Sequence, residues 1–200
     1  NRVDEAGKAL SVSIRELPAA EQNAAIASVP RVFARVQDKK TAADTVEKAL
    51  AAALKQSSTA AAAWTTLGRM ELASDQAPQA LAAARAGQAA DPASPYPALL
   101  ALELMERGQA DAEAVVKAHL QATPRSASGT PNVSLAYARI LLDLQRNAEA
   151  RAQLTQLTAQ QPELPEPWLL LGTLQVQDNA LPAASQSLNT YMGLARQSGD

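Results

Sequence analysis

The 200-residue chain has no cysteine and only one histidine, His119. The absence of cysteine excludes disulfides, thiolate metal sites and cysteine nucleophiles, and a single histidine cannot give a metal a pair of imidazole ligands. The sequence also lacks glycine-rich phosphate loops and the Gly-x-Ser-x-Gly nucleophile motif. His119 is therefore interpreted as a packed or surface histidine and not as a catalytic one. We expect no enzyme activity, no metal and no cofactor.

An excess of positive charge and long apolar runs are also missing. The chain has 18 basic and 20 acidic residues and a formal net charge of -2, with a pI of about 5.5, so no bulk field attracts nucleic acid or an anionic membrane. No apolar run reaches the 18 residues typical of a membrane span, so direct membrane insertion is not expected. A chain without cysteine fits a bacterial periplasm and a cytoplasm equally well, and the compartment stays open.

Aromatic residues make up only 3% of the chain, although hydrophobic residues make up 47%. Alanine is the commonest residue. It is the best helix former, and its small side chain lets helices pack closely, whereas the β-branched and aromatic residues that favour strands are scarce. The composition predicts an all-α protein.

One sequence pattern recurs along the chain. Trp64 is followed three and four residues later by Leu67 and Gly68, then by Ala80, and the stretch closes at Pro92. A full second copy begins at Trp168, with Leu171, Gly172 and Ala184 at the same offsets, and two weaker copies begin near Tyr96 and Ser134. The four starts are 32, 38 and 34 residues apart. The glycine positions of the two weaker copies hold Leu100 and Ala138, their small positions hold Ala112 and Ala150, and their closing prolines are Pro124 and Pro162.

This pattern resembles the tetratricopeptide repeat (TPR), a helix hairpin of about 34 residues with a Trp-x2-Leu-Gly start, small residues where its helices cross and a closing proline. The resemblance covers residues 64–196 well and 30–58 loosely. It implies antiparallel helix hairpins stacked as a right-handed α-solenoid. Leu100 at a glycine position, Ser134 at a bulky position and a last copy without a closing proline predict splayed or irregular middle repeats.

The domain organisation follows from the repeats. Residues 1–58 are expected to hold N-terminal helices ending at 17 and spanning 19–29, and a helix over 41–55 that Thr41 caps and that pairs with the stripe at 30–36 as a degenerate hairpin. Residues 59–200 are expected to form about four repeats and to continue the same solenoid. Their helices are predicted over 59–73, 77–90, 96–107, 111–122, 132–144, 147–160, 167–176 and 181–196. The Ser/Gly/Pro-rich segment 123–131 is an insertion between repeats, which we favour, or a binding loop.

The resemblance also implies a binding site. In such solenoids the first helices of successive hairpins line a concave groove that takes extended or helical peptides. The corresponding positions here are Thr65, Arg69, Leu72, Ala101, Leu104, Leu135, Arg139, Leu142, Leu169, Thr173 and Val176. The predicted groove is mostly aliphatic, with two arginines that either pair with a partner's carboxylate or lie solvated on the inner face. The basic cluster Arg31, Arg35, Lys39 and Lys40 is interpreted as a solvated face, because acidic residues are interleaved with it.

Three hypotheses for function follow. The leading one is a non-catalytic scaffold that binds a protein or peptide in the groove, within a bacterial assembly or envelope process; the Ala/Gln/Leu-rich style suggests the bacterial origin. The second is a homo-oligomer, because Leu188, Tyr191 and Leu194 recur at helical spacing in a last helix with no capping helix after it. The third is the regulatory or substrate-delivery arm of a larger enzyme. An RNA-reading helical repeat has nearly the same period, but the acidic pI disfavours it.

Overall fold

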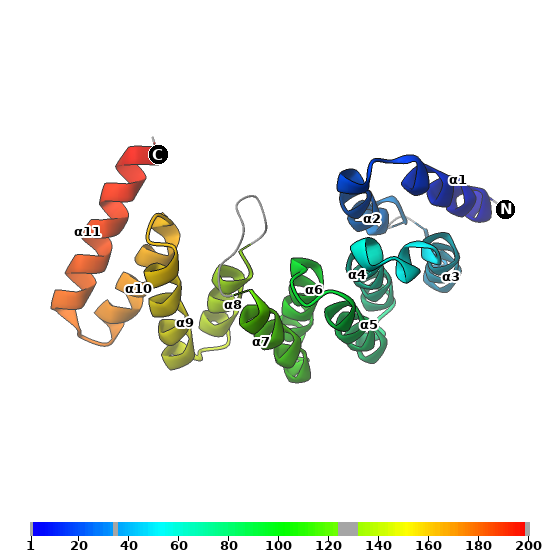
Figure 1. Ribbon diagram of the computed structural model, residues 1–200. Helices are drawn as coiled ribbons and strands as arrows, with labels where there is room; N and C mark the ends of the chain where they lie inside the picture. The colour runs from blue at the N-terminus through cyan, green and yellow to red at the C-terminus, as the bar shows by residue number, and fades with distance from the viewer. Residues whose placement is uncertain (1, 34–35, 124–131, 199–200) are drawn as a thin grey trace. The chain divides into compact units, whose positions relative to one another are not determined.

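The computed structural model describes residues 2–33, 36–123 and 132–198 (Figure 1). Every regular element within these ranges is helical, as the composition predicts. The elements are α1 (Arg2–Glu16), α2 (Ala19–Phe33), α3 (Lys39–Leu50), η1 (Ala53–Lys55), α4 (Ser57–Ala73), α5 (Ala77–Ala90), α6 (Pro95–Glu106), η2 (Ala110–Ala112), α7 (Glu113–Ala122), α8 (Val133–Asp143), α9 (Asn147–Gln160), α10 (Pro165–Gln177) and α11 (Leu181–Ser198). The predicted loop at 123–131 lies outside the described residues apart from Thr123.

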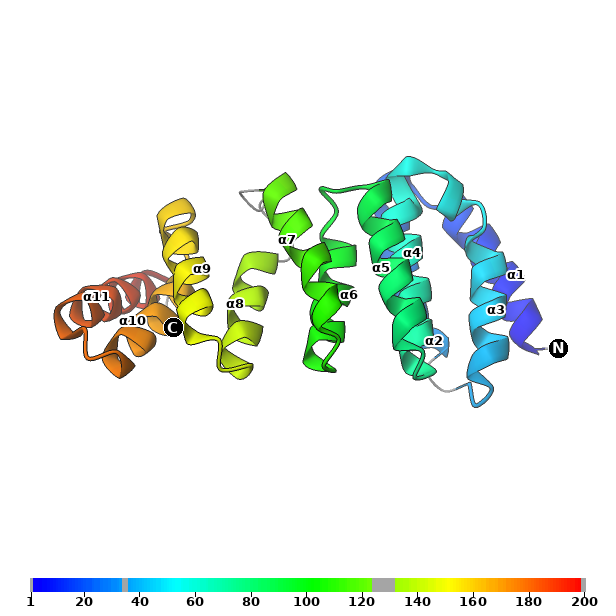
Figure 2. The ribbon, with the colours of Figure 1, turned by 90° about the horizontal axis from the view of Figure 1, so that it is seen from below.

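The helices group into two compact units, residues 1–123 and 124–200. Unit 1 contains α1 to α7 and unit 2 contains α8 to α11. Figure 2 shows α3 between α1 and the α4–α5 hairpin, and α3 contacts both α1 and α4. The N-terminal helices thus belong with the first two hairpins, and unit 1 continues across the expected boundary between residues 58 and 59. The expectation that all repeats form one continuous solenoid stays a prediction.

Helix α2 runs through a proline. The sequence predicted an end before Pro30, but α2 continues over Ala19–Phe33. Proline has no N–H, so the carbonyl of Ile26 four residues earlier loses its helical donor. The Thr66 hydroxyl of α4 donates to this oxygen at 2.9 Å, and both residues are buried. Packing of α2 on α4 therefore satisfies the carbonyl that Pro30 leaves without a helical partner.

Helix α3 begins and ends earlier than predicted. Asp38, not Thr41, is its N-cap: Oδ1 of Asp38 accepts from the Thr41 amide at 3.0 Å, and Oδ2 accepts from the Thr41 hydroxyl at 2.6 Å. The helix ends at Leu50, and the 3-10 turn η1 replaces the last turn of the predicted helix. The predicted pairing of this helix with the stripe at 30–36 is weak, because α3 packs mainly on α1 and α4 and only slightly on α2.

Four hairpins follow, α4–α5, α6–α7, α8–α9 and α10–α11, in the order that the repeats predict. The bounds of α5 and α9 coincide with the predicted ranges, whereas η2 replaces the first turn of the predicted helix at 111–122. The small residues predicted at the helix crossings are buried in all four hairpins, with exposures of 2% or less: Ala80, Ala112, Ala150 and Ala184. The repeat positions read from the sequence therefore serve the packing that the TPR resemblance assigns to them.

Gly68 brings the first two hairpins into close contact. A Cβ at this position would overlap Leu100 Cδ2 and would lie 3.1 Å from the Ala83 Cβ and 3.2 Å from the Ala80 oxygen. Leu100 is fully buried there. Its side chain fills the space that Gly68 of the preceding hairpin leaves free. The splayed or irregular geometry predicted for the middle repeats stays a prediction.

The turn inside each hairpin has the same backbone geometry. Its residues Asp75, Gly108, Gln145 and Asn179 have φ values of 58°, 84°, 60° and 58°, in the left-handed region. The next amide donates to a carbonyl five residues earlier at 2.8 or 2.9 Å: Gln76 to Glu71, Gln109 to Leu104, Arg146 to Leu141 and Ala180 to Gln175. This bond and the positive φ define the Schellman helix end. The sequence does not reveal the motif, because only one of the four turns has glycine at the position with positive φ.

Candidate functional site

The groove positions predicted in unit 1 are mostly buried. Thr65, Leu72, Ala101 and Leu104 have exposures of 1%, 4%, 0% and 0%. The cause is packing around the first helices of the hairpins, since α4 contacts α2, α3, α5 and α6, and α6 contacts α4, α5 and α7. These four side chains belong to the core and offer no surface to a partner. They are therefore excluded from the site proposed below, which corrects the predicted groove.

The two predicted groove arginines are held by carboxylates of the chain itself. Arg69 of α4 donates through Nε and Nη2 to Oε1 of Glu103 in α6, at 3.0 and 2.6 Å. Arg139 of α8 donates through Nε to Oε1 of Glu166 in α10 at 2.7 Å and forms an ion pair with it through Nη2. Each arginine thus connects the first helices of two successive hairpins. A partner's carboxylate would have to compete with Glu103 or Glu166 for these guanidinium groups.

A cleft in unit 2 contains two of the predicted groove residues. Its volume is about 390 Å³. One side comes from the end of α8 and the start of α9, and the other comes from α10. The lining residues are Leu142, Asp143, Gln145, Asn147, Leu170, Thr173, Leu174 and Gln177. We call this feature the α8/α10 cleft; the prediction placed Leu142 and Thr173 in the groove, and the structure brings them together here.

The remaining predicted positions of unit 2 keep accessible surface. Leu135 and Leu169 are half-buried, and Val176 is 49% exposed. The prediction missed Leu170 and Leu174 because α10 is apolar in the continuous run 168–171, so helical spacing does not single out one face. Whether the predicted residues bind a partner stays a prediction.

Of the residues predicted for self-association, Leu188 faces its own hairpin. A Cβ on Gly172 of α10 would lie 2.8 Å from Cγ and Cδ2 of Leu188, so this leucine packs on α10. Tyr191 and Leu194 are half-buried. The exposed large apolar side chains of α11 are two others, Leu181 at 58% and Met192 at 44%. The role of the predicted residues in self-association stays a prediction.

His119 is a packed histidine. It is 5% exposed, its Nδ1 lies 3.3 Å from the Pro92 carbonyl oxygen, and its Nε2 lies 3.2 Å from the Thr123 hydroxyl. Burial lowers the pKa of His119, and the Pro92 hydrogen bond and the charge of Asp91 oppose this shift. The described residues contain no group of three or more histidine or acidic side chains placed to hold a metal ion. None of their helices is both long and apolar enough to span a membrane.

The sequence of unit 2 matches a known family. Residues 131–174 match the family model of the tetratricopeptide repeat. The match spans α8, α9 and most of α10, which are the elements that line the α8/α10 cleft. No curated protein is similar enough in sequence to count as a match.

Solved structures share the fold over most of the chain. A crystal structure of MamA is 10% identical with a TM-score of 0.59, and the alignment covers 86% of this chain and 96% of that one. YrrB, described as a TPR protein with an unusual peptide-binding site, is 16% identical with a TM-score of 0.52 and coverages of 94% and 93%. PilF of Pseudomonas aeruginosa is 14% identical with a TM-score of 0.56 and coverages of 88% and 78%. At such identities the likeness establishes the fold, and together with the repeat match it identifies this chain as an all-α protein of the TPR fold with a tetratricopeptide repeat in residues 131–174.

Proposed function

We propose that the chain is a non-catalytic scaffold that binds a protein or peptide segment, and that the α8/α10 cleft holds part of this segment. The observation that carries the proposal is the cleft itself, which lies within the matched repeat except for Gln177 and contains two residues of the predicted groove. TPR proteins use such surfaces to bind peptides. The solved structure of YrrB, described as having a peptide-binding site, is consistent with this use of the fold.

The lining of the cleft suits a peptide. The half-buried Leu142 and Leu170 offer an apolar surface, and burial of one leucine-sized side chain of the partner is worth about 1.5–3 kcal/mol. Thr173 and Gln177 bring hydroxyl and amide groups that can hydrogen-bond to a peptide backbone. We therefore expect the cleft to select a segment with one or two aliphatic side chains.

The test is a peptide-display selection on the full chain, followed by isothermal titration of the selected peptide. Thr173→Trp places an indole in the cleft, and Thr155→Trp places the same side chain on an exposed position of α9 outside it. We expect Thr173→Trp to weaken binding at least tenfold and Thr155→Trp to leave the affinity unchanged. Equal affinities of the two variants would contradict the assignment of the cleft.

The proposal includes a cellular process for the scaffold, and two alternatives to the scaffold role stay open. The partner is expected in a bacterial assembly or envelope process. Self-association through α11 is one alternative, favoured by the exposed Leu181 and Met192. Light scattering distinguishes self-association from the scaffold role, since a 20.9 kDa monomer at high concentration would contradict self-association. If the chain is instead an arm of a larger enzyme, the full reading frame will contain a catalytic domain.

A further inference from the structure

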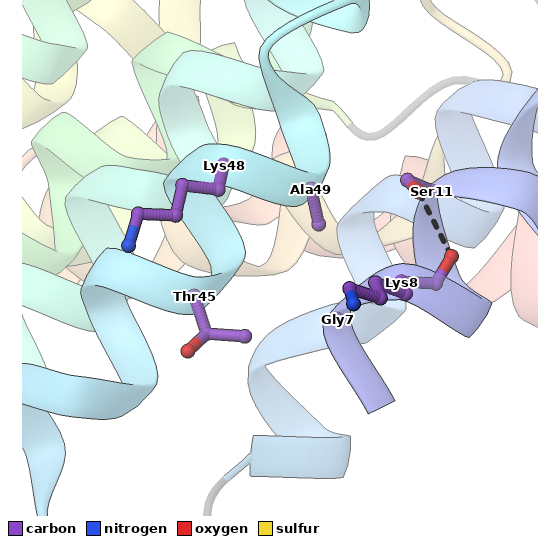
Figure 3. A pocket seen from close by; sticks show the side chains of 6 residues that line it. All are labelled: Gly7, Lys8, Ser11, Thr45, Lys48 and Ala49. Atoms are coloured by element: carbon purple, nitrogen blue, oxygen red, sulfur yellow. Dashed lines mark hydrogen bonds between the residues drawn. The ribbon is translucent and has the colours of Figure 1, made fainter. Parts of the chain in front are cut away.

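The N-terminal helices form a groove of their own, outside the TPR hairpins. Helices α1 and α3 pack closely, because Gly7 has no side chain and a Cβ there would overlap Thr45 Cγ2. A cavity of about 440 Å³ lies between them. Figure 3 shows its lining: Gly7, Lys8 and Ser11 on α1, and Thr45, Lys48 and Ala49 on α3.

A second cavity continues the first. It measures about 370 Å³ and shares Ser11, Lys48 and Ala49 with its neighbour. It extends past Arg15 and Gln22 to the turn that contains η1. We call the two cavities together the α1/α3 groove.

Among the residues whose side chains the structure describes, every charged residue that lines the α1/α3 groove is basic. They are Lys8, Arg15 and Lys48, and all three are exposed. Among the side chains that the structure describes, which do not include those of residues 1–4, no carboxylate forms an ion pair with any of the three, whereas Arg69 and Arg139 are both paired. The groove therefore offers three cations that no acidic side chain of the described residues neutralises.

The acidic residues of α1 and α3 whose side chains the structure describes are not among those that line the groove. Asp44 and Glu47 belong to α3, and neither is among the described residues that line the two cavities; their charges raise the pKa of Glu71 in α4. Glu5 and Glu16 of α1 are exposed, and they are not among the lining residues. At the level of sequence, residues 1–56 carry nine basic and seven acidic residues, whereas residues 57–200 carry nine and thirteen. The positive groove thus belongs to the one basic segment of an acidic chain.

Small side chains make up much of the lining of the groove, beside the larger Ile14, Gln22 and Gln56. Gly7, Ala49, Ala52 and Ala53 line it, and Ser11 adds a hydroxyl group. Small side chains leave room for an extended peptide backbone to approach the two helices. A bilayer needs exposed apolar anchors for stable insertion, and a duplex is too wide for a gap between two packed helices. Shape and charge together therefore favour an extended acidic peptide.

We propose that the α1/α3 groove binds an acidic peptide segment of a partner protein, with carboxylates of the peptide paired to Lys8, Arg15 and Lys48. This site is separate from the α8/α10 cleft and does not depend on it. Exposed ion pairs contribute modestly and are screened by salt, so the affinity falls steeply as ionic strength rises.

The test is a fluorescence-anisotropy titration of the full chain with fluorescein-labelled hexaglutamate at low salt. The groove variant carries Lys8→Gln, Arg15→Gln and Lys48→Gln. A charge-matched control carries Arg85→Gln, Lys117→Gln and Arg196→Gln, three exposed cations outside the groove. We expect the groove variant to bind about tenfold more weakly or worse, and the control to bind within twofold of the unmodified chain.

A second variant separates occupation of the groove from general attraction of charge. Ala52→Trp keeps the charge and places an indole at an exposed position of the groove. We expect it to weaken hexaglutamate binding at least fivefold, while Thr173→Trp in the other cleft has no effect. The proposal is overturned if hexaglutamate does not bind, if the groove and control variants bind equally, or if Ala52→Trp binds as the unmodified chain does. It is equally overturned if phosphatidylserine vesicles or oligo-dT bind more tightly than the peptide and lose affinity in the groove variant.

Discussion

The hydrogen bond between Thr66 and the Ile26 carbonyl gives the sharpest test of how unit 1 is held together. Thr66→Val removes the hydroxyl and keeps the shape of the side chain. The Ile26 oxygen is buried, and Pro30 cannot supply the helical N–H that would otherwise bind it. We therefore expect Thr66→Val to leave a buried carbonyl without a donor, which costs about 1–3 kcal/mol of unfolding free energy.

Thr65→Val is the matched control. Thr65 is as buried as Thr66, and its hydroxyl also donates to a carbonyl, that of Ala61 at 2.8 Å. That carbonyl lies four residues earlier in the same helix, so it also accepts the backbone N–H of Thr65. Without the Thr65 hydroxyl, the Ala61 carbonyl keeps its backbone donor. We therefore expect Thr65→Val to change the unfolding free energy by about 0.5 kcal/mol or less.

Thr66→Val and Pro30→Ala can be combined in a double-mutant cycle. Alanine at this position restores the N–H that can reach the Ile26 carbonyl, so Thr66→Val should cost far less in the Pro30→Ala background. The expected coupling energy between the two positions is at least about 1 kcal/mol.

Urea unfolding measures these differences. Trp64 lies in unit 1 and Trp168 in unit 2, so a Trp168→Phe background lets fluorescence follow unit 1 alone. A loss of 2 kcal/mol shifts the midpoint by about 1 M for a typical slope. The reasoning is refuted if Thr65→Val and Thr66→Val are equally destabilising, or if Pro30→Ala leaves the cost of Thr66→Val unchanged.

Three further predictions concern packing and pH. Gly68→Ala gains about 1 kcal/mol of helix propensity, but its Cβ would overlap neighbouring atoms, so we expect a net destabilisation of up to about 2 kcal/mol, measured by urea unfolding. Gly193→Ala is the control: nothing lies within 4 Å of a Cβ at that position, so this substitution should be stabilising. The pKa of Glu71 is raised by burial and then by two carboxylates of α3, so its ionised form opposes folding; Glu71→Gln should be more stable at pH 7 and equally stable near pH 3, and a lower midpoint at pH 7 would contradict this. The pKa of His119 is lowered by burial, so the unfolded state binds the proton at a higher pH than the folded state does, and the free energy of unfolding should fall as the pH falls from about 7 to about 5. His119→Gln should flatten this part of the stability–pH profile, and an unchanged slope would contradict the prediction.

The helix hairpins could be predicted because they depend on residues close together in the sequence. Prolines separate hairpins, and small residues mark helix crossings, which explains why the bounds of α5 and α9 coincide with the prediction. Features that depend on distant residues were not predictable. Helix α2 passes Pro30 because a hydroxyl 40 residues along the chain satisfies the freed carbonyl. The Schellman turns at Gln145 and Asn179 put residues other than glycine at positive φ, so composition does not reveal them.

The candidate site was only partly predictable for a related reason. A family register tells which side of a helix faces inward, but it does not tell how closely the next helix covers that side. In unit 1 the neighbours of α4 and α6 bury Thr65, Leu72, Ala101 and Leu104. In unit 2 a cleft of about 390 Å³ stays open between α8 and α10, and Leu142 and Thr173 line it.

The arginine pairs decide which substitutions can test binding. Arg69–Glu103, which is partly buried, and Arg139–Glu166, which is exposed, each connect successive hairpins, and an exposed pair contributes about 0.2–1 kcal/mol. Replacement of either arginine removes a contact between hairpins as well as a guanidinium group, so a loss of binding would not identify a ligand contact. Thr173 is exposed, and its hydroxyl donates to the Leu169 carbonyl within its own helix, so its replacement fills the cleft and disturbs no contact between helices. For this reason Thr173, and neither arginine, carries the test of the proposed function.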